Sequence, residues 1–239
     1  QIYIRVATDG PMAVPIRLTT VTSMQQRKIR TGYEYGFLYG VMFALGLYNL
    51  VLFSIIKQKE YGLYSLYLFG FIANSLSYTG QLFTFVTWDL GAHFQDWTDI
   101  FLMITYSIAG LHFARYLLST ADYAPKLDNF VINITLVIPA IMLLGALLGQ
   151  LLVSMIMAFV LNSSFAILFI IMGYRAVREG ISYAHLFLIS SVTAAVCIAI
   201  STLAVAGFMP YNDYTFKAIE FGMSFEAFFL AVILTRQFR

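Results

Sequence analysis

Residues 130–174 read FVINITLVIPAIMLLGALLGQLLVSMIMAFVLNSSFAILFIIMGY and contain no charged side chain. A single helix of these 45 residues would be about 68 Å long, roughly twice the hydrocarbon thickness of a bilayer. We therefore predict two membrane-spanning helices here, residues 130–149 and 151–174, joined by a tight turn near residues 145–150. The composition agrees, because 60% of the chain is hydrophobic and only 11% is charged, too little charge to solvate a soluble domain of this size.

The remaining apolar runs are long enough for five more spans. Short polar or charged segments separate them, such as Lys57–Glu60 and Met209–Asp213. The predicted fold is an all-α integral membrane protein, a seven-transmembrane-helix bundle over residues 31–239. Its five further spans are residues 35–56, 61–86, 98–118, 183–208 and 215–235.

The first thirty residues differ from the spans. Ile2–Val6 and Val14–Leu18 are short, alternating, β-branched stretches on either side of the turn signal Asp9-Gly10-Pro11. They predict a short β-hairpin, which alone is barely stable in water. We therefore interpret residues 1–30 as the C-terminal strands of an extracytoplasmic β-rich sensor domain, and we expect both ends of the chain to be cut from a longer protein.

Basic residues distinguish the two sides of the predicted bundle. The loops after the second, fourth and sixth spans contain no Lys or Arg, only Asp89, Asp96 and Asp213. Because cytoplasmic loops are enriched in Lys and Arg, we predict an outside N-terminus and a cytoplasmic C-terminus. The basic residues in Arg27–Arg30 would by themselves favour a cytoplasmic N-terminus. They follow the predicted extracytoplasmic segment, where the positive-inside rule is weaker. The residues that mark the cytoplasmic side are Lys57, Lys59, Lys126, Arg175, Arg178, Arg236 and Arg239.

The second span carries polar and aromatic side chains on one face. Polar side chains in a membrane helix point toward protein or a cavity. The face is therefore either a packed seam between helices or one wall of a ligand cavity, and we expect Leu66 and Ile72 on the lipid side. Its members, spaced by three and four residues, are Tyr64, Tyr67, Phe71, Asn74, Tyr78 and Gln81.

Glu226 lies near the middle of the last predicted span, on one face with Ala218 and Gly222. An ionised carboxylate at this depth costs at least a few kcal/mol unless it is paired. It is a structural clasp between spans, a switch whose pairing changes with signalling state, or part of a proton or ion path. The candidate partners in the first and third spans are Asn49, His112 and Arg115.

Other positions predict contacts between helices. Asn49 is expected to bond a second helix, and Lys217 and Glu220, one turn apart, to pair with each other. Small residues at steps of four predict a helix-packing face on the first span, because they let a neighbouring backbone approach. These residues are Gly32, Gly36, Gly40 and Ala44.

The sequence carries no recognisable catalytic or cofactor motif. Its three histidines are scattered, and it has no phosphate loop, dinucleotide fingerprint or nucleophile elbow. We therefore predict no catalytic residue, no metal site, no cofactor and no enzyme activity within this chain. The net charge of +2 argues against a nucleic-acid partner, and Cys197, the single cysteine, has no disulfide partner in the chain.

Several short segments follow one another along the chain in a recognisable order. They are Gly36-x-x-x-Gly40, Tyr48–Leu50, Tyr61–Tyr67, Gly80–Leu82, Ala114–Leu118 with Pro125, and Glu226 ahead of Leu234–Arg236. In this order they resemble the bacterial seven-transmembrane receptors with diverse intracellular signalling modules. Tyr3–Arg5 and Val14–Leu18 resemble the last strands of that family's periplasmic jelly-roll sensor domain, whereas Gln58 replaces an acidic residue often found in the first inner turn.

The resemblance implies a multi-pass protein of the bacterial inner membrane with a periplasmic N-terminus. Its implied function is to relay a periplasmic ligand signal, with a carbohydrate as one candidate ligand, to a cytoplasmic output module in cis after Arg239. A diguanylate cyclase or a histidine kinase there would mean cyclic-di-GMP or two-component signalling. Membrane lipid is the surrounding partner, and a homodimer is left open. The alternative function is a small-molecule transporter or channel subunit.

Overall fold

The computed structural model describes residues 20–82, 92–205, 207–210 and 212–237. These residues are mostly helical, and no β-strand occurs among them. The predicted strands at residues 2–6 and 14–18 lie outside the described ranges. The helices are α1 (Val21–Ile56), α2 (Lys59–Tyr78), α4 (Ala92–Leu118), α5 (Thr120–Tyr123), α6 (Pro125–Leu147), α7 (Leu151–Arg178), α8 (Ala184–Val205), α9 (Asp213–Phe216) and α10 (Ala218–Gln237).

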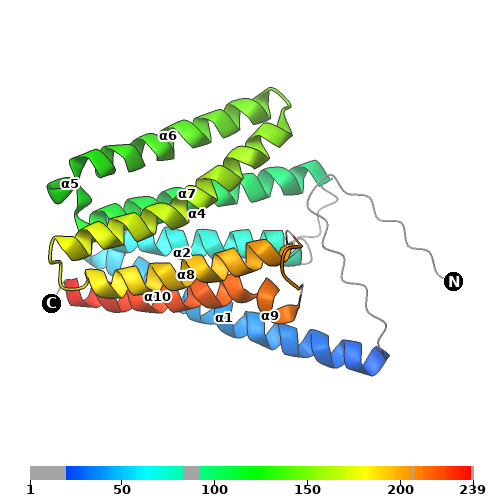
Figure 1. The fold of residues 1–239 in the computed structure, drawn as a ribbon. Coiled ribbons are helices and arrows are strands. Elements are labelled where there is room, and N and C mark those ends of the chain that lie inside the picture. Colours follow the sequence, from blue (N-terminus) through cyan, green and yellow to red (C-terminus); the bar gives the residue numbers. More distant parts are fainter. Residues whose placement is uncertain (1–19, 83–91, 206, 211, 238–239) are drawn as a thin grey trace.

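Six of the long helices form a closed ring. Each packs on the next in the order α1, α2, α4, α7, α8 and α10, and α10 packs on α1 again. Helix α6 lies outside the ring, against α7 and α4 (Figure 1). Helix α5 and the last turns of α10 lie at one end of the bundle, and α9 and the first turns of α1 at the other. We call these the α5 end and the α9 end.

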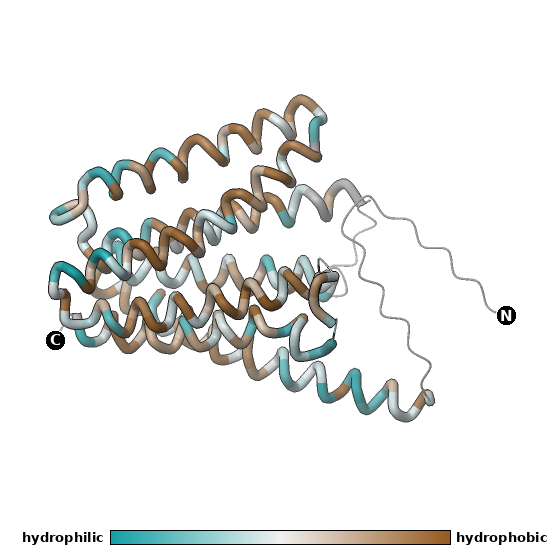
Figure 2. Tube along the Cα trace, viewed as in Figure 1, coloured by the Kyte–Doolittle hydropathy of each residue, from teal (hydrophilic) through white to brown (hydrophobic). Residues whose placement is uncertain are grey.

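The long helices have the length and composition of membrane spans. Among the described residues, α1, α4, α6, α7, α8 and α10 are each long and apolar enough to cross a bilayer. Hydrophobic residues follow the middle of the bundle and hydrophilic ones gather at its ends (Figure 2). Helix α2 has 20 residues but is less apolar, because it carries four tyrosines and three serines. The all-α membrane fold is therefore confirmed, while α2 as a seventh span stays a prediction.

Helix α1 begins at Val21 rather than near residue 35. The Thr20 hydroxyl caps it by accepting a hydrogen bond from the Ser23 amide at 3.4 Å. A helix of 36 residues is about 54 Å long, well beyond the roughly 30 Å of a hydrocarbon core. Residues 21–30, which the sequence placed with the β-rich segment, are therefore helical and extend past the rest of the bundle (Figure 1).

Other boundaries differ from the predicted spans by a few residues. Helix α6 begins at Pro125 rather than at residue 130, because proline is well suited to the first helical position. The predicted turn between the two apolar spans is confirmed: Gly149 adopts φ +70° and the Gln150 amide bonds the Gly145 carbonyl at 2.8 Å. Helix α2 ends at Tyr78, whereas the predicted span runs to residue 86, past the described residues.

The predicted packing face of small residues on α1 is wrong within this chain. A Cβ atom added at Gly32, Gly36 or Gly40 would meet nothing within 4 Å. The larger side chains of α1, Tyr39 and Met42 among them, turn toward the ring instead, because they have more apolar surface to bury. The glycines consequently lie on the outer surface of the bundle.

Candidate functional site

A charged cluster joins the first turns of α1 to α9 at the α9 end. Arg27 forms an ion pair with Asp213. Arg30 donates through Nε to Glu34 Oε1 at 2.8 Å and through Nη2 to the Tyr214 hydroxyl at 3.0 Å. Helix α9 is held by a capping box, in which the Asn212 side chain and the Thr215 hydroxyl bond each other's backbone amides. We call Arg27, Arg30, Glu34, Asp213, Tyr214 and Lys217 the α1–α9 joint.

Lys217 is the buried member of this joint. It lies between α9 and α10 with 5% of its surface exposed. Its Nζ donates to Glu34 Oε2 at 2.5 Å and to Thr31 Oγ1 at 3.4 Å, and it lies 5.0 Å from the centre of the Tyr35 ring. Glu34 thus accepts hydrogen bonds from Arg30 on its own helix and from Lys217 between α9 and α10. A polar cavity of about 490 Å³ opens among these side chains.

Stacked tyrosine rings and then hydrogen bonds continue from the joint into the ring. The Tyr35 and Tyr39 rings stack with their centres 5.4 Å apart. Ser75 Oγ donates to Glu220 Oε1 at 3.2 Å and lies 2.8 Å from the Tyr39 hydroxyl. Because the one hydroxyl proton of Ser75 goes to Glu220, Tyr39 must be the donor to Ser75. Glu220, 1% exposed, is thereby tied to α1 through α2.

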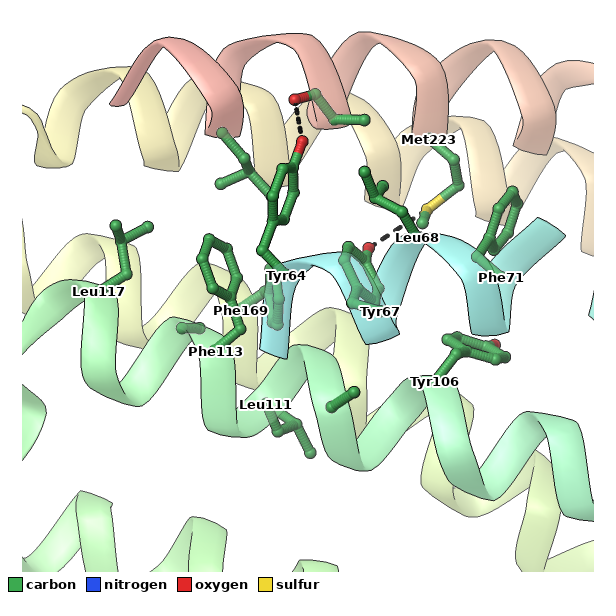
Figure 3. Packing of buried hydrophobic residues seen from close by; sticks show 14 of the residues in the cluster. Tyr64, Tyr67, Leu68, Phe71, Tyr106, Leu111, Phe113, Leu117, Phe169 and Met223 are labelled. Carbon is green, nitrogen blue, oxygen red and sulfur yellow. Dashed lines mark hydrogen bonds between the residues drawn. The ribbon is translucent and has the colours of Figure 1, made fainter. Parts of the chain in front are cut away.

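Two tyrosines of α2 fill the centre of the ring and point to α10 (Figure 3). Tyr64 and Tyr67 are fully buried. The Tyr64 hydroxyl donates to the Ala227 carbonyl. The Tyr67 hydroxyl lies 3.0 Å from Glu226 Oε2 and 3.6 Å from Met223 Sδ, and the carboxylate is the stronger acceptor of the two. These bonds fix α2 against α10 at the depth of Glu226.

Glu226 itself lies in the interior, with 1% of its surface exposed. It forms no ion pair with any residue in the described part of the chain. The hydrogen-bond partner of Glu226 is Tyr67 of α2, and not one of the predicted residues Asn49, His112 and Arg115. Asn49 is buried, but its side-chain nitrogen donates to the Leu45 carbonyl of its own helix at 2.8 Å. This bond stays within α1 and is not the predicted bond to a second helix.

His112 and Arg115 belong to a second cluster, at the α5 end. Arg115 binds both carboxylate oxygens of Asp128, through Nε at 2.6 Å and Nη2 at 2.7 Å, and Thr120 donates to the same carboxylate at 2.8 Å. Arg115 Nη1 lies 2.8 Å from His112 Nδ1. Since guanidinium can only donate, Nδ1 is the acceptor and the ring proton is on Nε2, 3.4 Å from the Thr135 hydroxyl. The cluster ties α4 to α5 and α6.

Tyrosines also pack around α5, outside the spans. The Tyr183 hydroxyl donates to the Leu117 carbonyl at 2.9 Å. Burial raises the pKa of the Tyr123 hydroxyl to about 12, with Tyr183 and Glu179 adding to the shift. This hydroxyl is therefore neutral at physiological pH, and the tyrosine contributes to the packing around α5 rather than acting as an acid.

The predicted polar face of α2 is correct in its first half only. Tyr64 is buried and Leu66 is 47% exposed, as predicted. Ile72 is buried, contrary to prediction, because α1, α4 and α10 surround α2 on three sides. Tyr78 is 54% exposed and rests on the Phe216 ring, with the ring centres 5.9 Å apart. The two remaining members, Asn74 and Gln81, are half-buried.

The ion pairs of these clusters were not predicted from the sequence. Lys217 pairs with Glu34 rather than with Glu220, which bonds Ser75. The Arg30–Glu34 spacing of four is a helix signal, but it counts only if α1 begins before residue 30. Asp128 was placed in a loop, although Pro125 three residues earlier signals a helix start.

These clusters hold pairs of helices together. Among the described residues, no three His, Cys, Asp or Glu side chains gather to hold a metal ion. The buried polar groups instead connect helices in pairs, from the joint through Glu220 and Glu226. The helices and their apolar surfaces define a multi-pass membrane protein.

A comparison with known families identifies it further. Residues 32–237 match the model of the 7TM diverse intracellular signalling family. The chain belongs to this family, whose members carry a seven-transmembrane signalling domain. No curated protein and no solved structure matches the chain.

Proposed function

We propose that this chain is the membrane domain of a receptor that relays an extracytoplasmic signal to a cytoplasmic output module, with α10 as the element that carries the signal. One observation supports this most directly. Lys217, Glu220 and Glu226 are all buried on or next to α10, and each has its bonding partner on α1 or α2. The first half of α10 is thereby held to α1 and α2 by buried polar bonds.

The α1–α9 joint is the input of the proposed relay. Helix α1 extends beyond the bundle, so a force on its first turns acts on Arg27, Arg30 and Glu34. Those side chains contact Asp213, Tyr214 and Lys217, which lead directly into α10. A displacement of α1 would therefore change the position of α10, in the manner of helix shifts known from other switches. At the α5 end, α10 leads to the C-terminal residues of this chain.

The charges support an N-out orientation with α2 as the seventh span. The α5 end holds Lys57, Lys59, Lys126, Arg175, Arg178 and Arg236, so the positive-inside rule makes this end cytoplasmic. Arg27 and Arg30 at the α9 end have ionic partners in the fold, which accounts for basic residues on the outer side. The output module would follow on the cytoplasmic side as a diguanylate cyclase or a histidine kinase, and the ligand would act in the periplasm.

A charge-swap series tests the relay. A diguanylate cyclase domain fused after Arg239 reports output as cyclic-di-GMP in bacterial cells. Arg27→Asp and Asp213→Arg should each shift basal output by breaking the joint, whereas the double variant should restore it. Output that does not respond to either single variant, in protein inserted at normal levels, would contradict the relay. Solute flux through the purified chain in liposomes would favour the transporter function instead.

A further inference from the structure

An apolar groove of about 460 Å³ lies on the outside of the ring, between α1, α2 and α4 near the α5 end. Its walls include Leu50 and Phe53 of α1 and Leu63 and Leu66 of α2. Leu50 and Leu66 are 42% and 47% exposed, so the groove opens to the surroundings of the bundle. Gly62 leaves room beside Phe53, since a Cβ there would come within 3.0 Å of that ring. At this position in a membrane protein the groove faces lipid.

One cation stands at the edge of this groove. Lys59, at the start of α2, is the single charged residue in its lining. The ammonium group lies 5.6 Å from the centre of the Tyr116 ring. Lys59 forms no ion pair with any residue that the structure describes, and no carboxylate lines the groove. The positive charge of Lys59 thus lies beside the apolar groove without an ionic partner among the described residues.

We propose that this groove is a binding site for one anionic phospholipid. The acyl chain lies between Leu50, Phe53 and Leu66, and the phosphate group lies at Lys59. An acyl chain that packs against these apolar side chains buries no polar group without a partner. A lysine at the membrane surface attracts anionic headgroups. A zwitterionic phospholipid fits the same walls but brings no net charge to the lysine. The site therefore selects by headgroup charge.

The groove is in contact with the cluster at the α5 end. His112 lines the groove and is bonded to Arg115, which holds Asp128. A bound lipid would consequently bridge α1 and α2 to the helix that carries this cluster. Binding does not depend on the proposed relay, so the two proposals fail separately.

Native mass spectrometry of the purified chain tests the site. The protein in detergent is titrated with phosphatidylglycerol and, separately, with phosphatidylcholine of the same acyl chains. The wild-type chain should bind phosphatidylglycerol about fivefold more tightly than phosphatidylcholine, the size expected for one surface lysine. Lys59→Gln should lower the affinity for phosphatidylglycerol by about fivefold and so remove this preference. Lys59→Arg should retain it. Lys126→Gln, an exposed lysine at the same end but outside the groove, is the matched control and should bind like wild type.

A second variant tests the apolar part. Leu66→Trp should fill the groove and weaken both lipids, whereas free glycerol phosphate should not compete with phosphatidylglycerol. The proposal is overturned if Lys59→Gln binds phosphatidylglycerol as wild type does, or if Lys126→Gln loses as much. Competition by glycerol phosphate would also overturn the proposal. It would show that the anionic group alone accounts for binding and that the apolar groove takes no part. Thermal melting in detergent confirms that each variant is folded.

Discussion

At the scale of single residues, the interior of the ring depends on pairs of polar groups that are each other's main partner. Glu220 accepts from Ser75, and Glu226 accepts from Tyr67. In hydrocarbon, the loss of one partner leaves the other without a substitute from water. Removing one member should therefore cost more than removing both, and this asymmetry can be measured.

We expect Glu226→Leu to destabilise the protein by about 1–3 kcal/mol, because it leaves the Tyr67 hydroxyl only the weak acceptor Met223 Sδ. Glu226→Gln keeps an acceptor oxygen and should cost less. In the double variant Glu226→Leu/Tyr67→Phe, part of the loss should be recovered. Unfolding in detergent, followed for all four members of the cycle, measures the coupling. Strict additivity would mean that the hydroxyl and the carboxylate act independently.

Asp128 offers a second test, at the α5 end. Asp128→Asn should destabilise the protein by about 3–5 kcal/mol, because it leaves the Arg115 guanidinium buried without its bidentate partner. Arg115→Lys should also weaken the cluster, since an ammonium group cannot bind both oxygens in the same fork. Lys126→Gln on the same helix is exposed and should change stability by less than about 0.5 kcal/mol. An Asp128→Asn variant as stable as this control would show that the pair contributes nothing.

At the scale of elements, close approach of helices occurs where glycine faces a neighbour, not where glycines recur. Gly222 on α10 meets α8, and a Cβ there would lie 2.5 Å from Cys197 Cβ. Gly36 on α1 recurs at steps of four, yet it faces outward with nothing within 4 Å. The same substitution at these two positions therefore separates packing from helix propensity.

Gly222→Ala should destabilise the protein by about 1–3 kcal/mol, because α8 and α10 must move apart. Gly36→Ala should be neutral or stabilising by up to about 1 kcal/mol, since alanine is the better helix former. Thermal unfolding of both variants in detergent makes the comparison. A large loss at Gly36 would show that this face packs on another molecule, which would support the homodimer that the sequence left open.

At the scale of the whole molecule, the orientation in the membrane is the property on which the proposed relay depends. A cysteine at Phe208, 82% exposed near the α9 end, should react with a membrane-impermeant maleimide on spheroplasts. A cysteine at Glu179, exposed at the α5 end, should react only after the membrane is opened. Cys197 within α8 serves as the unreactive background. The reverse labelling pattern would place the output side of the bundle outside the cell.

The sequence by itself determined the membrane class, the approximate positions of six spans and the family. Hydrophobicity and charge act locally along the chain, so residues 130–174 predict two helices and a turn near residues 145–150 without knowledge of the neighbours. The buried position of Glu226 follows from the same argument, because an acid within an apolar span must avoid lipid.

Only the tertiary structure decided which side chains meet. Helices of similar composition can be arranged in several orders around a ring, and each order gives Glu226 different neighbours. The structure places Tyr67 of α2 beside it and directs Arg115 to Asp128. It also turns Gly32, Gly36 and Gly40 outward, because burying the larger side chains of α1 gains more apolar contact than burying the glycines.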